Sequence, residues 1–321
     1  MNNNSLSVFL SVVEEMSFTK AAQKLYITQQ SLSGHIKRIE ETYGVRLFDR
    51  KPRLRLTPEG EAMAFYARQM VRAERNLTDR FADISRNAGG YLDIGMSQQR
   101  SSAFFEGFWM RFHPAYPNID VRLTAENTQG LLGDLMQGDI NLMVGINVAQ
   151  APRLEIEQLT TETIRCVVSG KLMRKYFPDT HESILAHASR KGMPPEKLAM
   201  LPLMVMPEGN RLRVTMDSMF QRAGVMPHII LESSQQDLSL RIALKGEAAA
   251  AISPIVLYSY YREKGRLPKD MYSFRIEGAV ENRVSLVSRT DAPKHSFLDA
   301  AKQAIREEYD VYNRTMKEAG L

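Results

Sequence analysis

The sequence predicts an α+β multidomain protein, in which a helical N-terminal module is followed by one long helix and then by a larger α/β region. At 321 residues the chain is longer than one ordinary domain. Helical periodicity dominates the N-terminal part, whereas short apolar runs alternate with helical patterns after residue 90. Between these regions the consecutive glycines Gly89 and Gly90 follow a long uninterrupted helical pattern, which indicates a domain boundary.

Composition and charge narrow the class of protein. A hydrophobic content of 44% and a charged content of 25% are typical of a globular protein. No apolar run approaches the roughly 18 residues that span a bilayer, and no basic segment followed by an apolar stretch begins the chain. We therefore expect no membrane partner and a cytoplasmic location. The single cysteine, Cys166, lies in an apolar strand pattern, so a buried inert thiol is expected, with a redox role through an interchain disulfide as the alternative.

The first three helices are predicted from spacing and capping. Apolar side chains recur at helical spacing over residues 5–15, which predicts an amphipathic helix. Ser17 can cap a short second helix over residues 20–25, and Thr28 can cap a third helix of about 15 residues.

The third helix carries apolar side chains on one face and hydrogen-bonding side chains on the other. Glutamine can pair with adenine, serine with several base edges, and lysine or arginine with guanine or phosphate. A solvated polar face is the alternative interpretation. The predicted inward residues are Leu32, Ile36, Ile39 and Tyr43, and the candidate DNA contacts are Gln29, Gln30, Ser31, Ser33, Lys37 and Arg38.

A basic hairpin is predicted directly after this helix. Gly44 can end the helix, and two alternating stretches, 45–48 and 54–57, flank a turn. Residues 1–90 carry 14 basic and 10 acidic side chains, so most of the net charge of +5 lies there. A wing beside a recognition helix can hold DNA phosphates, although a solvated loop would show the same charges. The candidate phosphate contacts are Arg50, Lys51 and Arg53.

These segments together resemble the LysR-type transcriptional regulator family. The resemblance covers nearly all of residues 5–65 and includes the spacing of the motifs, which read Phe18-Thr19-x-Ala21-Ala22-x-x-Leu25-x-x-Thr28-Gln29-Gln30-Ser31-Leu32-Ser33, Gly44-x-x-Leu47-Phe48-x-Arg50 and Leu56-Thr57-Pro58-x-Gly60. It implies that Thr28 and His35 also contact DNA in the major groove. The chain departs from the family at Gln30, where proline is usual, and at Gly34, where arginine is common, so its target sequence is expected to differ.

The long helix predicts self-association. Thr57-Pro58 begins a helical pattern that runs without a breaker to about residue 86. Apolar residues recur on a heptad seam, and a rod of about 43 Å is too long to be buried alone. We expect a homodimer, and the resemblance adds a homotetramer; packing on the chain's own wing is the alternative. The predicted dimerisation residues are Met63, Ala67, Met70, Leu77, Phe81 and Ile84.

The remaining region is predicted to be layered α/β. Expected helices are Ser102–Phe112, Thr128–Gln137, Arg211–Ala223, Asp237–Lys245 and Phe297–Met316. Expected strands are Tyr91–Gly95, Ile119–Thr124, Ile140–Ile146, Thr163–Ser169, Leu203–Met206, Ile229–Glu232, Ala248–Ser253, Tyr272–Ile276 and Val284–Ser288.

The resemblance continues here at lower specificity, in Leu92-x-Ile94-Gly95, Tyr116-Pro117-Asn118 and Ile252-Ser253-Pro254. It implies an effector-binding domain similar to periplasmic solute-binding proteins, with two lobes and a ligand cleft between them. The expected organisation is a winged helix-turn-helix at 1–57, a linker helix at 58–88 and an effector-binding domain at 89–321. Its lobe I would hold 91–161 and 276–321, and its lobe II would hold 162–275.

Ligands of open α/β sheets bind beyond the carboxyl ends of the strands, near helix N-termini. Polar loops at these places are therefore the candidate effector site, and Arg100 with the helix dipoles favours an anionic effector. Ordinary helix capping is the alternative for each residue. The candidates are Ser97, Gln98, Gln99, Arg100, Ser101, Ser102, Asn127, Thr128, Asn147, Asn210 and Ser233.

No P-loop, dinucleotide-binding, serine-hydrolase or zinc-protease motif is present, so neither an enzyme, a metal nor a cofactor is expected. Residues 179–197 form an insertion relative to the family that has no assigned role. The sequence thus predicts a ligand-responsive DNA-binding regulator, with RNA polymerase expected among its partners. The alternative is a small-molecule-binding protein or enzyme whose N-terminal module serves only assembly.

Overall fold

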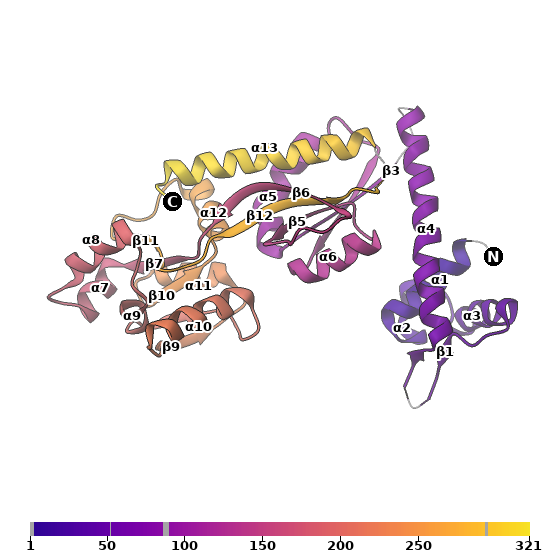
Figure 1. The fold of residues 1–321 in the computed structure, drawn as a ribbon, viewed down its shortest axis with the longest axis horizontal. Helices are drawn as coiled ribbons and strands as arrows, with labels where there is room; N and C mark the ends of the chain where they lie inside the picture. Colours follow the sequence, from indigo (N-terminus) through magenta and orange to yellow (C-terminus); the bar gives the residue numbers. More distant parts are fainter. Residues whose placement is uncertain (1–2, 52, 86–89, 293–294) are drawn as a thin grey trace.

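The computed structural model of the chain describes residues 3–51, 53–85, 90–292 and 295–321. It consists of a small helical domain with a two-stranded sheet, then a long helix, then two five-stranded sheets with their helices (Figure 1). This architecture confirms the predicted α+β multidomain class, with a winged helix-turn-helix, a linker helix and a two-lobed α/β region.

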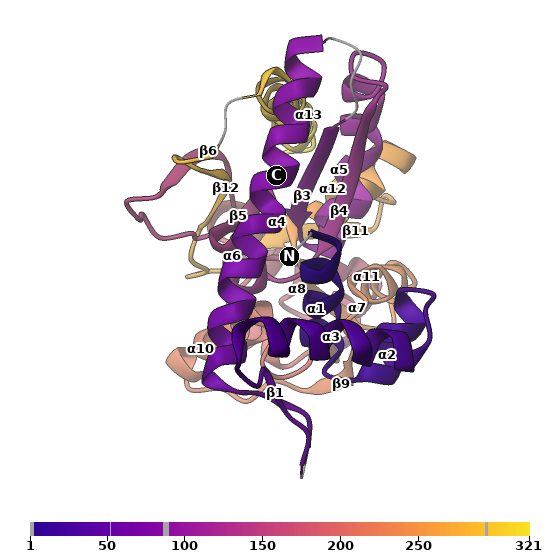
Figure 2. The ribbon, with the colours of Figure 1, turned by 90° about the vertical axis from the view of Figure 1, so that its right-hand side faces the viewer.

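The N-terminal domain packs three helices around one apolar core. Helix α3 (Gln29–Tyr43) begins where the Thr28 side chain accepts a hydrogen bond from a backbone amide, and it ends at Gly44, whose φ of 66° is left-handed. The α3 residues predicted to face inward are largely buried, namely Leu32, Ile36 and Ile39, whereas Tyr43 is exposed. The other elements are α1 (Asn3–Glu15), α2 (Phe18–Lys24), β1 (Phe48–Asp49) and β2 (Arg55–Leu56), and the β1–β2 hairpin projects beyond the helices (Figure 2).

Helix α4 (Pro58–Ser85) is fixed to this domain at its first turn. The Thr57 hydroxyl accepts a hydrogen bond from the Gly60 amide at 2.9 Å. A Cβ on Gly60 would lie 2.1 Å from the carbonyl oxygen of Leu47, so glycine is required for this close approach. The helix therefore leaves the domain in one defined direction.

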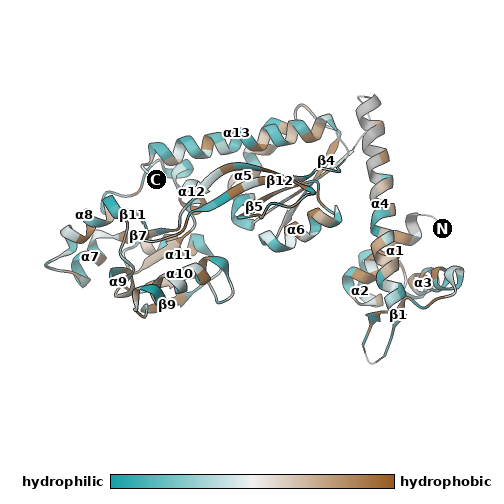
Figure 3. Cartoon of the chain, in the orientation of Figure 1, coloured by the Kyte–Doolittle hydropathy of each residue, from teal (hydrophilic) through white to brown (hydrophobic). Residues whose placement is uncertain are grey.

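Lobe I is built on a sheet with the strand order β4-β3-β5-β12-β6. The strand β3 pairs in parallel with β4 and β5, whereas β12 returns from late in the chain and pairs antiparallel with β5 and β6. Helix α13 shows alternating hydrophilic and hydrophobic residues, as expected for a helix with one buried face (Figure 3). The elements are β3 (Gly90–Met96), α5 (Gln98–Phe112), β4 (Ile119–Ala125), α6 (Thr128–Gln137), β5 (Leu142–Ile146), β6 (Leu154–Glu162), β12 (Asn282–Arg289) and α13 (Ser296–Glu318).

Lobe II is built on a second sheet with the order β11-β7-β10-β8-β9. The strand β10 pairs in parallel with β8 and antiparallel with β7, and alanines fill its buried positions. The elements are β7 (Arg165–Ser169), α7 (Gly170–Tyr176), α8 (His181–Lys191), α9 (Pro195–Ala199), β8 (Leu203–Val205), α10 (Arg211–Ala223), β9 (Ile229–Glu232), α11 (Gln236–Leu244), β10 (Ala249–Ile252), α12 (Pro254–Lys264) and β11 (Met271–Arg275).

The chain passes between the lobes twice, after β6 and again before β12. The first crossing follows Glu162, close to the predicted boundary. At the second, residues 276–279 still contact lobe II, since Ile276 bridges to Met193 and the Arg222 guanidinium donates to the carbonyl of Gly278. The second crossing therefore lies nearer to Asn282 than to the predicted boundary at residue 276.

Some elements were not predicted from the sequence. The strand β6 is one of them, because its glutamates break up the apolar pattern that predicts a buried strand. These glutamates face partners on α13: Glu157 accepts two hydrogen bonds from Arg306, at 2.7 and 2.8 Å. The helices α7, α8, α9 and α12 are others. The insertion at 179–197 contributes to the core of lobe II, because it buries the apolar side chains Ile184, Ala188 and Met193 there.

Candidate DNA-binding and effector-binding sites

The outward face of α3 presents the predicted DNA contacts to solvent. Gln29 receives one hydrogen bond, from the Thr19 hydroxyl at 3.4 Å, which links α3 to α2. A Cβ on Gly34 would meet nothing within 4 Å, so the structure offers no steric reason for glycine there. Ser33 and His35 are half-buried, and the exposed residues of the predicted set are Thr28, Gln29, Gln30, Ser31, Lys37 and Arg38.

The wing carries cations that the fold leaves available. The guanidinium of Arg50 lies over the Phe18 ring, 5.0 Å from its centroid, which holds the charge at the base of the hairpin. Lys51 and Arg53 are exposed, and their side chains have no ion-pair partner within the described residues. The exposed polar residues of α3 and the exposed cations of the wing thus lie in the same small domain.

The predicted dimerisation seam divides into two parts along α4. Ala67 is fully buried and Met63 partly buried against the core of the chain's own N-terminal domain, so these two residues are not available to a partner. The core that they join is formed by residues of α1, α2 and α3 as well as by the wing residues Leu47 and Phe48, so the predicted alternative, packing on the chain's own wing, describes only part of their surroundings. The side chain of Ile84 lies outside the described residues, and the exposed members of the seam are Met70, Leu77 and Phe81.

Several predicted effector residues serve as helix caps. The Asn127 side chain accepts hydrogen bonds from the amides of Gln129 and Gly130, at 3.0 and 3.1 Å. Asn210 accepts one from the second residue of α10 at 2.8 Å, and the Ser233 hydroxyl accepts one from the amide two residues on at 3.1 Å. Thr128 accepts one from the amide of Ile146. An intramolecular hydrogen bond therefore occupies one acceptor of each of these four side chains, and those of Asn127 and Asn210 are helix caps.

The loop that opens α5 is only partly accessible. Ser97 precedes the helix without a side-chain capping bond, and its carbonyl accepts a hydrogen bond from the Ser101 hydroxyl at 3.1 Å. Gln98 and Ser102 are exposed, whereas the predicted residues Ser97, Gln99 and Ser101 are half-buried.

Arg100 requires a correction, because it does not face an open loop. The side chain is 2% exposed, and its guanidinium donates to both carboxylate oxygens of Glu162, at 2.6 and 3.1 Å, and to the Tyr309 hydroxyl at 2.8 Å. Burial disfavours the charged guanidinium, but Glu162 outweighs that effect and raises the pKa of Arg100. Arg100 therefore joins α5, the end of β6 and α13, and its charge is already neutralised.

A second arginine, which the sequence analysis missed, connects the two lobes. Arg211, the first residue of α10 in lobe II, donates to the side-chain oxygen of Asn282 in lobe I at 2.6 Å. The same oxygen accepts a hydrogen bond from Asn147 at 2.9 Å. Asn147, a predicted effector residue, has a left-handed φ of 52°, which non-glycine residues adopt mainly where surrounding contacts enforce it. Its place at a helix N-terminus is the one local feature that could have drawn attention to Arg211.

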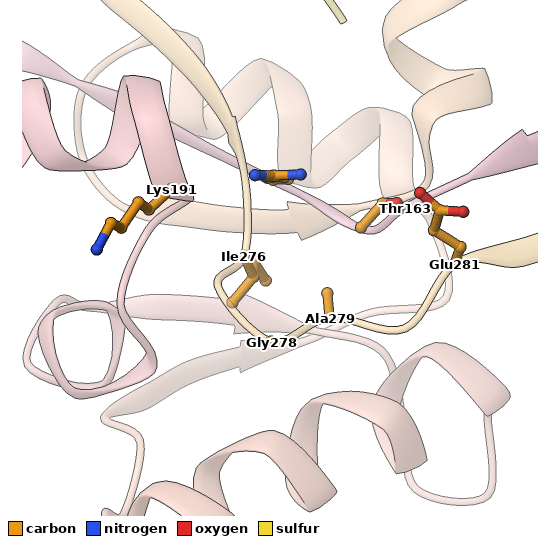
Figure 4. Close-up of a pocket in the computed structure, with 7 residues that line it drawn as sticks. Thr163, Lys191, Ile276, Gly278, Ala279 and Glu281 are labelled. Carbon is orange, nitrogen blue, oxygen red and sulfur yellow. The ribbon is translucent and has the colours of Figure 1, made fainter.

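A pocket of about 220 Å³ lies at the second crossing between the lobes (Figure 4). Its lining contains none of the predicted effector residues, and the Lys191 side chain points away from the other labelled residues. The lining residues are Thr163, Lys191, Arg275, Ile276, Gly278, Ala279 and Glu281.

Other candidate chemistries find little support in the described part of the chain. Burial raises the pKa of the Cys166 thiol to about 12, so the reactive thiolate is scarce near neutral pH. Across the described ranges, no group of three or more His, Cys, Asp or Glu side chains could hold a metal ion. None of the helices searched there is long and apolar enough to cross a membrane.

Comparison with known families gives two matches that divide the chain as the structure does. Residues 3–61 match the bacterial regulatory helix-turn-helix protein model of the lysR family. Residues 85–310 match the LysR substrate binding domain.

Individual proteins resemble this chain over much of its length. The glycine cleavage system transcriptional activator of Escherichia coli (strain K12) is 30% identical over 190 residues, which are 57% of this chain and 59% of that protein. The HTH-type transcriptional regulator YcgK of Bacillus subtilis (strain 168) is 25% identical over 242 residues, 73% of this chain and 74% of that protein. The crystal structure of full-length CbnR complexed with its target DNA has a TM-score of 0.60 at 20% identity, over 96% of this chain and 100% of that one.

Proposed function

This chain belongs to the LysR family of DNA-binding transcription regulators, and we propose that it binds promoter half-sites as an oligomer in response to a small effector held between its two lobes. The relatives are regulators and not enzymes. One observation carries the proposal: the polar face of α3 is exposed beside wing cations that lack ion-pair partners within the described residues. A module that served only assembly would not need such a surface.

The exposure of residues on α3 and on the wing supports the following assignment of DNA contacts. The N-terminal end of α3 enters the major groove, where Gln29 and Ser33 contact base edges, and Lys51 and Arg53 of the wing contact phosphates. The remaining predicted residues of this surface, Thr28, Gln30, Ser31, His35, Lys37, Arg38 and Arg50, flank these contacts.

The oligomer forms through the exposed part of α4. Met70, Leu77 and Phe81 are between 49% and 57% exposed on a helix that protrudes from its own domain, and a second copy would cover them. Two paired helices place two recognition helices on neighbouring half-sites. A homodimer is the minimal assembly, and a homotetramer is a pair of such dimers.

Effector binding is coupled to DNA through the lobes. A ligand that favours one arrangement of the lobes changes the relative placement of paired domains and thereby the spacing or bending of the DNA. Such a change alters promoter occupancy or access of RNA polymerase in the cytoplasm, where the chromosome lies. A ligand that binds the effector domain without changing the promoter footprint would contradict this coupling.

The experiment that tests the DNA-binding assignment is fluorescence anisotropy with the upstream intergenic DNA of the protein's own gene and with a scrambled duplex at equal salt. Gln29→Ala with Ser33→Ala is expected to weaken selective binding roughly ten- to hundred-fold, which corresponds to about 1–3 kcal/mol for lost base contacts. The matched control is Gln221→Ala with Ser218→Ala, which changes the same residue types at exposed positions on α10. Equal and weak binding of the unaltered protein to both duplexes would contradict the proposal.

A further inference from the structure

Two hydrogen-bonded groups of side chains make up what we call the inter-lobe cluster: Arg211 with Asn282 and Asn147, and Arg100 with Glu162. The charges of Arg100 and Glu162 act on the guanidinium of Arg211. The guanidinium of Arg211 crosses from α10 of lobe II to the Asn282 side-chain oxygen at 2.6 Å. Although Arg211 as a residue is exposed, this hydrogen bond is partly buried. Within the described residues, the hydrogen-bond partner of the Arg211 guanidinium is thus a neutral amide. The Nε and Nη2 groups of Arg211 make no hydrogen bond with these residues.

The charges of the cluster do not balance. It contains two guanidinium groups and one carboxylate, and the carboxylate of Glu162 already receives hydrogen bonds from Arg100 on both oxygens. Partial burial lowers the pKa of Arg211, the positive charge of Arg100 lowers it further, and Glu162 opposes the two effects. One positive charge, on Arg211, is therefore left without a counter-ion.

We propose that Arg211 is the receptor for a single carboxylate group, and that the effector of this protein is a small monocarboxylate. This inference rests on the proposed function, since it names the chemistry of the same inter-lobe site. A guanidinium presents parallel N–H groups that match the two oxygens of a carboxylate. A singly charged anion neutralises the cluster, whereas a dianion leaves it with an excess of negative charge.

The site also explains how the ligand would act on both lobes. Arg211 belongs to lobe II, and its present partner Asn282 begins the lobe I strand β12. Asn147 follows β5, and its side-chain amide donates a hydrogen bond to Asn282. The side-chain oxygen of Asn147 accepts a hydrogen bond from the backbone amide of Arg283 at 2.8 Å. A carboxylate bound to Arg211 and the Asn147 amide would contact both lobes at once.

The test uses the full-length protein and three probes, acetate, butyrate and benzoate, each compared with its neutral amide at equal ionic strength. The readout is the thermal unfolding midpoint. At about five times its Kd, a bound carboxylate is expected to raise Tm by about 2–4 °C. Arg211→Gln is expected to weaken the response about ten- to hundred-fold in ligand concentration, because a charged hydrogen-bond partner is removed. Arg211→Lys is expected to restore part of the rise in Tm, because lysine keeps the positive charge. The control Arg190→Gln removes an exposed arginine of α8 that has no part in the cluster, and it leaves the response unchanged.

Two results would overturn the inference: none of the three carboxylates raises Tm more than its amide, or the rise persists in Arg211→Gln. A greater rise with inorganic phosphate than with every carboxylate would also overturn it, in favour of a dianion. Anisotropy with promoter DNA on the same samples separates this failure from failure of the proposed function. Selective DNA binding without a carboxylate response refutes only the monocarboxylate, whereas loss of both refutes the regulator assignment.

Discussion

Polar side chains near helix N-termini have different fates in the DNA-binding domain and in the effector domain. On α3, the side chains of Gln30, Ser31 and Arg38 remain exposed, and Thr28 caps the start of the helix. Lys37 is exposed as well but lies 3.5 Å from the carboxylate of Glu41. In the effector domain, Asn127 and Asn210 cap helices, and Arg100 is buried in an ion pair. The comparison shows that residue type alone does not identify a binding surface. What identifies one is the absence of an intramolecular partner.

The difference follows from architecture. The N-terminal domain is small, so one side of α3 packs on the core, and none of the elements that the structure describes covers the other side. The two lobes instead bring strands and helices from distant parts of the chain against each other, and these supply partners for polar groups. Three predictions test this contrast, beginning with the largest effect.

Arg100→Met is expected to lower the free energy of unfolding by about 3–5 kcal/mol, because Glu162 would remain buried without its partner. The measurement is urea unfolding followed by the fluorescence of Trp109, the single tryptophan, which lies on the same helix. The double variant Arg100→Met with Glu162→Leu should recover much of the loss. A loss below about 1 kcal/mol would show that Arg100 is free for a ligand after all.

Lys51→Gln with Arg53→Gln is expected to weaken binding to all duplexes alike. The slope of log affinity against log salt should become shallower by about 2, about one for each lost phosphate contact. Anisotropy titrations at several salt concentrations give this slope. The control Lys171→Gln with Arg174→Gln removes two cations that pair with Glu247 and Asp270, and it should leave the slope unchanged. An equal change in both variants would assign the effect to net charge rather than to the wing.

Asn127→Ala is expected to cost about 1 kcal/mol of stability, because two amides at the start of α6 lose their acceptor. Gln30→Ala, on the exposed face of α3, should stay within about 0.5 kcal/mol. Thermal unfolding of the two variants side by side measures the difference. If Gln30→Ala destabilised the protein as much as Asn127→Ala does, the residue would belong to the fold and not to an interface.

The sequence predicted the N-terminal domain closely because its determinants are local. Caps such as Ser17 and Thr28 lie directly before their helices, and the spacing of apolar residues specifies the buried face of α3. The family resemblance was strongest in the same region. The structure and the family matches confirmed the predicted fold class and regulator function. The individual DNA contacts stay predictions.

The effector domain was predicted less well because its determinants are distant in sequence. Arg100 finds Glu162 and Tyr309 at separations of 62 and 209 residues, so no local pattern could show that it is buried. The glutamates of β6 pair with basic residues of α13, far along the chain, so the local pattern did not indicate a strand. Arg211 was missed for the same reason: its importance comes from Asn282, 71 residues later.

The close contact at Gly60 also determines where this regulator can be cut and recombined. Ala64 and Ala67, on the first turns of α4, belong to the core of the N-terminal domain. A chimera that joins this DNA-binding module to a foreign sensor at residue 57 would remove part of that core. A junction beyond Val71, which still packs there, would transfer an intact module. The smallest transferable DNA-binding module therefore includes about half of the predicted linker helix at 58–88.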